Sequence, residues 1–191
     1  MMAGTMVAAL PTDDLGALEA RLWAELVTAA HTRGHAWRTP VLATAGGAAG
    51  VDARVVVLRE VDLPAHELVF FTDARSPKMA QIAAHPQATL VMWSAELGWQ
   101  LRLGVQLGLE NSGLAVSSRW ARLKMTPAAQ DYLSPLPPGA PLGVHPAPER
   151  GSREHFAVVT AQVLVMDWLA LDPAGHRRAV FDTAGARWVQ P

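Results

Sequence analysis

The chain has 191 residues, of which 50% are hydrophobic and 17% are charged, and its formal net charge is -1. This composition is typical of a folded globular protein of one domain, spanning residues 1–191, and it excludes a disordered chain. The charge argues against nucleic acid as a partner, because nucleic-acid binding usually needs a basic excess. The absence of cysteine excludes disulfides, thiolate metal sites and cysteine nucleophiles.

The first ten residues are mildly apolar but lack the basic flank of a signal peptide. No apolar run elsewhere in the chain reaches the length that spans a membrane. We therefore expect a cytoplasmic protein without a membrane partner.

The first half of the chain predicts one helix followed by β-hairpins. Leucines recur at helical spacing over 12–34, after Thr12 as a candidate N-cap, and the pattern ends at a glycine. A strand over 39–44, a glycine-rich turn at 46–50 and a return strand over 51–59 form a predicted hairpin. A strand over 67–72 and a short helix over 77–84 follow.

The second half contains the clearest periodicity, a strict alternation of apolar with polar or glycine residues over 97–110. This pattern predicts a long, half-buried strand whose polar face carries Gln100 and Arg102. Beyond it we expect a helix over 115–124, an irregular arm or lid over 126–152, a strand over 156–171, and a closing hairpin over 176–181 and 187–189. Successive hairpins with few helices predict a mainly β (α+β) fold, an antiparallel barrel with flanking helices.

The turn between the strand at 67–72 and the next helix is rich in groups that bind phosphate. Arg75, Ser76 and Lys78 offer a guanidinium, a hydroxyl and an ammonium beside the free amides of a helix N-terminus. This set suits a dianionic phosphate. The alternative is that Ser76 caps the helix while both cations are solvated.

Four motifs in this order resemble the pyridoxamine 5′-phosphate oxidase-like family. They are RTPVLAT (38–44), RVVVLR (54–59), FFTDARSPK (70–78) and GHRRAVF (175–181), and the resemblance extends from about Trp37 to the C-terminus. It implies a split β-barrel that binds FMN at the interface of a homodimer.

The resemblance also implies roles for particular residues. Arg54 and Lys78 would bind the FMN phosphate, assisted by Ser76 and Arg75. Gln100 would form a hydrogen bond near the flavin. The remaining cofactor-binding residues would be Val55, Val56, Val57, Phe71 and Thr72, together with Trp168 and Arg178 from the other subunit. Arg178 and His176 would act in catalysis, and Arg59 and His176 would contact the substrate.

The expected function is that of an FMN-dependent oxidoreductase, in which a small substrate passes a hydride to the flavin. Ala174 stands where the oxidases place an arginine over the substrate, so we expect pyridoxamine phosphate to be a poor substrate. Pro77 also replaces an arginine of the phosphate turn. Two alternatives remain open: a non-catalytic flavin carrier or redox sensor, and a split barrel that uses haem or a deazaflavin.

His31 and His35 are spaced four residues apart, as two metal ligands on one helix face would be. Gly34 is expected to end the helix between them, and no third ligand is apparent. We therefore predict a surface or capping role for these histidines and no metal site.

Overall fold

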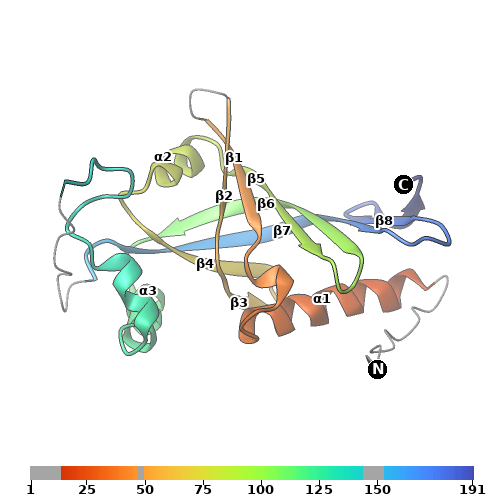
Figure 1. Cartoon of the computed structure of the whole chain (residues 1–191), viewed down its shortest axis with the longest axis horizontal. Helices are drawn as coiled ribbons and strands as arrows, with labels where there is room; N and C mark the ends of the chain where they lie inside the picture. Colours follow the sequence, from red (N-terminus) through yellow and green to blue (C-terminus); the bar gives the residue numbers. More distant parts are fainter. Residues whose placement is uncertain (1–13, 47–49, 144–152) are drawn as a thin grey trace.

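A computed structural model describes residues 14–46, 50–143 and 153–191, and within these ranges nine strands form one antiparallel sheet (Figure 1). The strand order is β2-β1-β5-β6-β7-β4-β3, with β8 beside β7 and β9 beside β8. The strands are β1 (Val41–Ala45), β2 (Val51–Val55), β3 (Leu58–Asp62), β4 (Glu67–Asp73), β5 (Gln87–Ser94), β6 (Trp99–Glu110), β7 (Phe156–Ala170), β8 (Arg177–Asp182) and β9 (Gly185–Val189). The helices are α1 (Leu15–His31), α2 (Pro77–Ala84) and α3 (Leu114–Leu123), with the short 3₁₀ helices η1 (Ala36–Arg38) and η2 (Pro127–Tyr132).

The predicted mainly β fold is confirmed, and two elements differ from expectation. The return strand expected over 51–59 is two strands, because β2 pairs with β1 whereas β3 pairs with β4 at the other end of the strand order. The run of valines is compatible with strand on either side of the break, so local sequence does not mark it. Strand β5, between β1 and β6, was not among the predicted elements.

Helix α1 covers one side of the sheet and begins later than expected (Figure 1). Asp14 caps it by accepting a hydrogen bond from the backbone N–H of Ala17 at 3.0 Å, whereas Thr12 lies outside the described residues. The helix ends at His31, and Gly34 then adopts a φ of 83°, a left-handed conformation that glycine accepts readily. The apolar face of α1 is fully buried and includes Leu18, Leu22 and Leu26.

Two clusters of buried side chains lie on opposite sides of β7. The main core joins α1 to the inner face of the sheet and includes four tryptophans, with the Trp99 and Trp168 ring centroids 5.4 Å apart. A second cluster packs Trp120 of α3 and Tyr132 of η2 around Phe156. Part of the segment predicted as an irregular arm over 126–152 is therefore a packed 3₁₀ helix; residues 144–152 of that arm lie outside the described residues.

Arg38 closes the C-terminal end of α1. Its guanidinium donates to the carbonyl oxygens of Ala29, at 3.2 Å, and Ala30, two acceptors that the helix itself leaves unpaired. Replacement of Arg38 by methionine keeps the apolar stem but removes both donors.

We expect Arg38→Met to lower the free energy of unfolding by about 1–3 kcal/mol, the usual cost of leaving buried polar groups unpaired. Urea denaturation would measure this. The matched control is Arg33→Met, because Arg33 is exposed in the same connection; its effect should stay within about 0.5 kcal/mol. Equal losses in the two variants would show that the carbonyl contacts contribute nothing specific.

Candidate functional site

The residues predicted to bind the phosphate lie where β2, the end of β4 and the start of α2 converge. The guanidinium of Arg54 donates to Thr44 Oγ1 at 2.6 Å and to Gln81 Oε1 at 2.8 Å, and pairs with Asp52 at 2.5 Å. The hydrogen bonds from Gln81 and Arg54 lower the pKa of Asp52. We call Arg54, Thr72, Ser76 and Lys78 the phosphate corner.

Lys78 lies in this corner with hydroxyl acceptors. Its Nζ donates to Thr72 Oγ1 at 2.9 Å and to Ser76 Oγ at 3.2 Å. Burial lowers the pKa of Lys78, and the nearby charge of Arg54 lowers it further, although Asp73 and Asp52 oppose this shift. The charge of Arg54 thus disfavours the charge of Lys78, and Asp52, which is paired with Arg54, compensates part of this effect.

The N-terminus of α2 faces the same place. Ser76 is the N-cap residue and Pro77 occupies the first turn, but the Ser76 side chain makes no capping hydrogen bond. The alternative interpretation is thus met in part: Ser76 occupies the N-cap position, but its side chain does not cap the helix, and Lys78 and Arg75 both have protein partners. Its hydroxyl instead contacts Lys78 and lies 3.3 Å from Thr72 Oγ1.

Arg75 is held by other groups. It forms a two-point ion pair with Asp73, with nitrogen–oxygen distances of 3.1 and 2.7 Å, and donates to the carbonyl oxygens of Ser134 and Pro135. These contacts join the phosphate turn to the segment after η2. The predicted role of Arg75 in phosphate binding stays untested, and its observed partners give it a structural one.

A second set of predicted residues lies on the face of β6, β7 and β8 that is turned away from the main core. Gln100 of β6 pairs with Leu169 of β7, and Leu169 pairs on its other side with Arg178 of β8. Arg178 donates to both carboxylate oxygens of Asp167, at 2.9 and 2.8 Å, and Arg102 pairs with the same carboxylate. These hydrogen bonds, with that of Arg178 the largest effect, lower the pKa of Asp167. Two guanidiniums thus share one carboxylate, which leaves an excess of positive charge.

The other predicted residues are divided among surface and core. Val55 is exposed, Val56 packs against the main core, and Phe71 meets Phe156 edge to face at 5.1 Å. His176 is exposed, and its Nδ1 accepts a hydrogen bond from the backbone N–H of Asp172 at 3.3 Å. Val57 is half-buried in the link between β2 and β3.

Trp168 is fully buried in the main core, between Trp99 and Trp188. Its indole Nε1 is buried without a hydrogen-bond partner. A side chain in this place supports the barrel and does not present a surface to a flavin. The expected contact of Trp168 with a flavin in another subunit is therefore not part of our proposal.

One chain does not bring the two sets together. Figure 1 shows α2, which bounds the phosphate corner, and β8, which carries Arg178, at well-separated places along the sheet. Strand β7 accounts for this separation, because its first residues pair with the end of β4 at Asp73 and its last residues pair with β8.

A third cluster of cations was not recognised as a unit from the sequence. Arg59, Arg119, Arg122 and Thr126 line a cavity of about 200 Å³ between β3, β4 and α3. Arg59 lies over the Phe71 ring at 5.8 Å, and its buried Nε has no hydrogen-bond partner. The spacing of Arg119 and Arg122, three residues apart on one helix face, is the signal that could have revealed it.

Glu60 reduces the positive charge of this cavity. It pairs with Arg119 at 2.9 Å and with Arg122 at 3.5 Å. Three arginines face one glutamate, so the cavity remains suited to an anion.

Neither a metal cluster nor a membrane-spanning helix is found in the described parts of the chain. The Nδ1 of His35 accepts the backbone N–H of Trp37, and its Nε2 therefore donates to Glu25 Oε1 at 2.9 Å. The predicted capping role is thus confirmed for His35.

Known sequences include relatives of this chain. Residues 20–108 match the family model described as pyridoxamine 5′-phosphate oxidase, FMN-binding domain. The chain is 28% identical over 164 residues to the pyridoxine/pyridoxamine 5′-phosphate oxidase of Granulibacter bethesdensis, which covers 78% of this chain and 77% of that protein. A 62-residue segment is 50% identical to the protein of the same name from Thermosynechococcus vestitus, but it covers 32% of this chain and spans just 28% of that relative.

Solved structures show the same fold. A pyridoxamine 5′-phosphate oxidase-related, FMN-binding protein from Nostoc punctiforme superimposes with a TM-score of 0.67 at 22% identity, covering 96% of this chain and all of that one. PhzG from Burkholderia lata, in complex with tetrahydrophenazine-1-carboxylic acid, superimposes with a TM-score of 0.69 at 18% identity. The alignment covers 98% of this chain and 100% of that one. The predicted split-barrel fold and the resemblance to the pyridoxamine 5′-phosphate oxidase-like family are therefore confirmed.

The ion pairs of Asp167 predict how stability depends on pH. The pKa of Asp167 is lower in the folded chain than its ordinary value, so its contribution to stability is present above the ordinary value and is lost as pH falls through the folded pKa. Asp167→Asn should destabilise the protein by about 1–3 kcal/mol at neutral pH. The difference from wild type should shrink below about pH 4, as followed by urea denaturation at several pH values. A difference that is independent of pH would contradict the ion-pair account.

Proposed function

From the resemblance to the pyridoxamine 5′-phosphate oxidase-like family, we propose that this chain binds FMN and passes a hydride from a small anionic substrate to the flavin. The phosphate corner is the observation that carries the proposal. Lys78 lies at the N-terminus of α2, where its hydrogen-bond partners are two hydroxyls, and Arg54 contacts the next turn of the helix at Gln81 and acts electrostatically on Lys78. A phosphate would relieve the repulsion between the cations and accept from the helix amides and both hydroxyls.

The residues on the outer face of β6, β7 and β8 suit the flavin ring, at the end of FMN away from its phosphate. When bound, FMN supplies an acceptor for two electrons, and negative charge then develops on its ring. The excess positive charge of Arg102, Asp167 and Arg178 would stabilise that charge, and Asp167 would hold the Arg178 guanidinium in a fixed orientation. Gln100, beside this group on the same sheet face, would contribute hydrogen bonds.

A site built from both sets requires two copies of the chain. The outer sheet face between the sets exposes Trp93, which is 46% exposed opposite Gln100, and Val41 and Val55, at 38% and 62%. An exposed apolar face beside polar groups is a plausible composition for a subunit interface. A two-fold dimer would place the phosphate corner of one chain beside Arg178 of its partner and form two identical sites.

The arginine cavity supports an anionic substrate. In this proposal Arg59, Arg119 and Arg122 bind a phosphate or carboxylate of the substrate, and Thr126 adds a hydroxyl. The curated relatives are named as oxidases of pyridoxine and pyridoxamine 5′-phosphate. Ala174 cannot supply a charge over such a substrate, so we propose a different anion as the one that this chain oxidises.

A non-catalytic flavin carrier is the second candidate, and one observation favours it. Arg178 already donates to both carboxylate oxygens of Asp167, and His176 lies exposed in a turn, where its Nδ1 accepts the backbone N–H of Asp172. Slow reoxidation of reduced bound flavin by oxygen, with no turnover of any anionic amine or alcohol tested, would support the carrier. An absorbance spectrum of the purified protein separates FMN from haem and deazaflavin.

The phosphate corner makes a prediction in which function and stability move in opposite directions. Lys78→Met should weaken FMN binding by one to two orders of magnitude, because a charge-assisted hydrogen bond contributes about 1.5–3 kcal/mol. The same change should raise the melting temperature of FMN-free protein, because the fold penalises the Lys78 charge. Isothermal titration and thermal unfolding measure the two effects.

Riboflavin, which lacks the phosphate, provides the control for this variant. It should bind the wild type poorly, and Lys78→Met should hardly change its affinity. Equal affinities of the wild type for riboflavin and FMN would show that the corner does not bind the phosphate.

The shared site predicts complementation between variants. Arg54→Ala and Arg178→Ala should each bind FMN weakly as homodimers. In a mixed dimer one site carries both substitutions and the other carries neither, so co-refolding should restore tight binding at a fraction of sites. If each site drew all of its groups from one chain, every site in the mixture would carry a substitution. Absence of recovery in verified mixed dimers, or a monomer by light scattering, would refute the shared site.

A further inference from the structure

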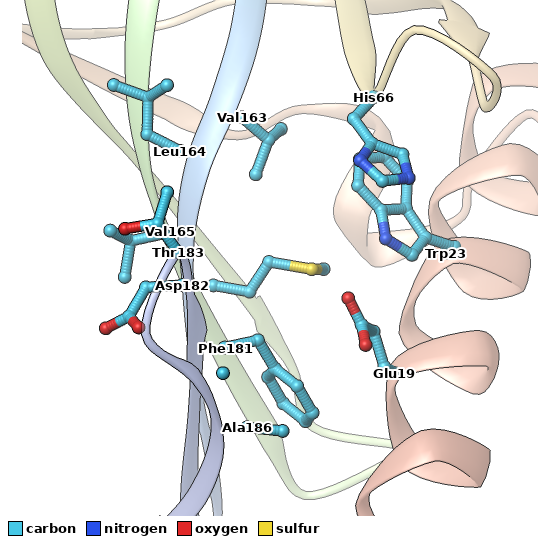
Figure 2. A pocket seen from close by; sticks show the side chains of 12 residues that line it. Glu19, Trp23, His66, Val163, Leu164, Val165, Phe181, Asp182, Thr183 and Ala186 are labelled. Carbon is cyan, nitrogen blue, oxygen red and sulfur yellow. The ribbon is translucent and has the colours of Figure 1, made fainter.

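A cavity of about 290 Å³ lies apart from both sets of proposed flavin-binding residues (Figure 2). It is enclosed by α1, the turn between β3 and β4, the middle of β7 and the turn between β8 and β9. The residues that carry the argument are Glu19, Trp23, His66, Val163, Phe181 and Asp182.

The cavity arises because β7 changes partner strands at this point. Strand β4 pairs with β7 as far as Gln162, and β8 begins to pair at Met166. Between them, β7 carries a bulge relative to β6, and the Val163 N–H donates to the backbone oxygen of His66 at 3.0 Å. The change of strand partner thus opens space beside the middle of β7, which side chains of α1, β7 and β8 then line.

One end of the cavity is aromatic. Trp23 is buried, and its ring stacks on that of His66 with centroids 4.9 Å apart. His66 has a φ of 52°, uncommon for a residue other than glycine, and its backbone oxygen is bonded to β7, which holds it in place. Phe181 of β8 also lines the cavity, apart from this pair (Figure 2).

The charge that faces the cavity is negative. Figure 2 shows the Glu19 carboxylate directed from α1 into the space between Trp23 and Phe181. Within the described chain Glu19 forms no ion pair or hydrogen bond that would neutralise it. Asp182, on the opposite wall, is paired with Arg187 at 2.7 Å and turns its carboxylate away from Glu19.

We propose that this cavity binds a small primary amine with a compact aromatic or apolar body, whose ammonium pairs with Glu19. A neutral apolar molecule would remove water from the carboxylate without replacing its hydrogen bonds, and an anion would be repelled. An ammonium supplies both charge and donors, while Trp23, Phe181 and Val163 contact the body. A cavity of about 150 Å³ accommodates benzene in another protein, so about 290 Å³ has room for a ring with an aminomethyl group.

Benzylamine is the probe for this proposal. It should bind the full-length, FMN-loaded wild type with a Kd of about 1 mM or below, and at least tenfold more tightly than benzyl alcohol or benzoate. Glu19→Gln keeps the shape of the side chain and should weaken benzylamine binding about tenfold or more, as expected for loss of a charge-assisted bond. Isothermal titration gives the affinities, and the indole NMR resonance of Trp23 reports the location.

The matched control is Glu110→Gln, which removes one negative charge at the exposed end of β6, outside the cavity. It should leave benzylamine affinity unchanged, and the FMN content of both variants should equal that of wild type. Equal binding of benzylamine and benzyl alcohol, equal losses in the two variants, or no binding at millimolar concentrations would each overturn the proposal. None of these outcomes bears on FMN, because the cavity shares no residue with the phosphate corner.

Discussion

The pairing of β7 determines where every candidate site lies. This fifteen-residue strand pairs with β6 along almost its whole length, while its other edge pairs first with β4 and then with β8. The end of β4 carries the chain into α2 and so forms the phosphate corner. The β8 end carries Arg178, and the change of partner between them opens the cavity beside Glu19. Because a folded strand is stiff, these three places cannot approach one another within one chain.

Charge rather than burial of apolar surface distinguishes the candidate sites from the rest of the molecule. A net charge near zero hides local excesses: Arg54 with Lys78 in the phosphate corner, and Arg102 with Arg178 around one carboxylate. Like charges at short range destabilise a folded chain unless an oppositely charged group joins them. Such an arrangement is typical of functional sites, where stability is given up for binding.

Sequence patterns predicted most of the elements, because amphipathic periodicity and turn residues are local properties. The alternation over 97–110 became β6, and the leucine repeat became α1. The break between β2 and β3 was missed because it depends on which distant strand each half pairs with, which no valine run encodes. Motif resemblance predicted that Arg54, Ser76 and Lys78 would meet, and the structure places them together. It could not reveal that Arg75 is held by Asp73, or that Trp168 faces the core, since both depend on side-chain direction in the folded chain.

The arginine cavity and the Glu19 cavity differ in how they are connected to the proposed flavin-binding residues. The arginine cavity lies between α3 and β4, beside Phe71, which itself packs against the second cluster of buried residues. Its ligands are therefore held by elements that continue into the phosphate corner through β4, so an anion there and a phosphate in the corner would be positioned by the same strand. The Glu19 cavity instead depends on α1 and on the β8–β9 turn, which carry none of the phosphate-corner residues. Binding there would reach the second set of residues through β7 and β8, since Met166 precedes Asp167 on β7 and Phe181 lies three residues after Arg178 on β8.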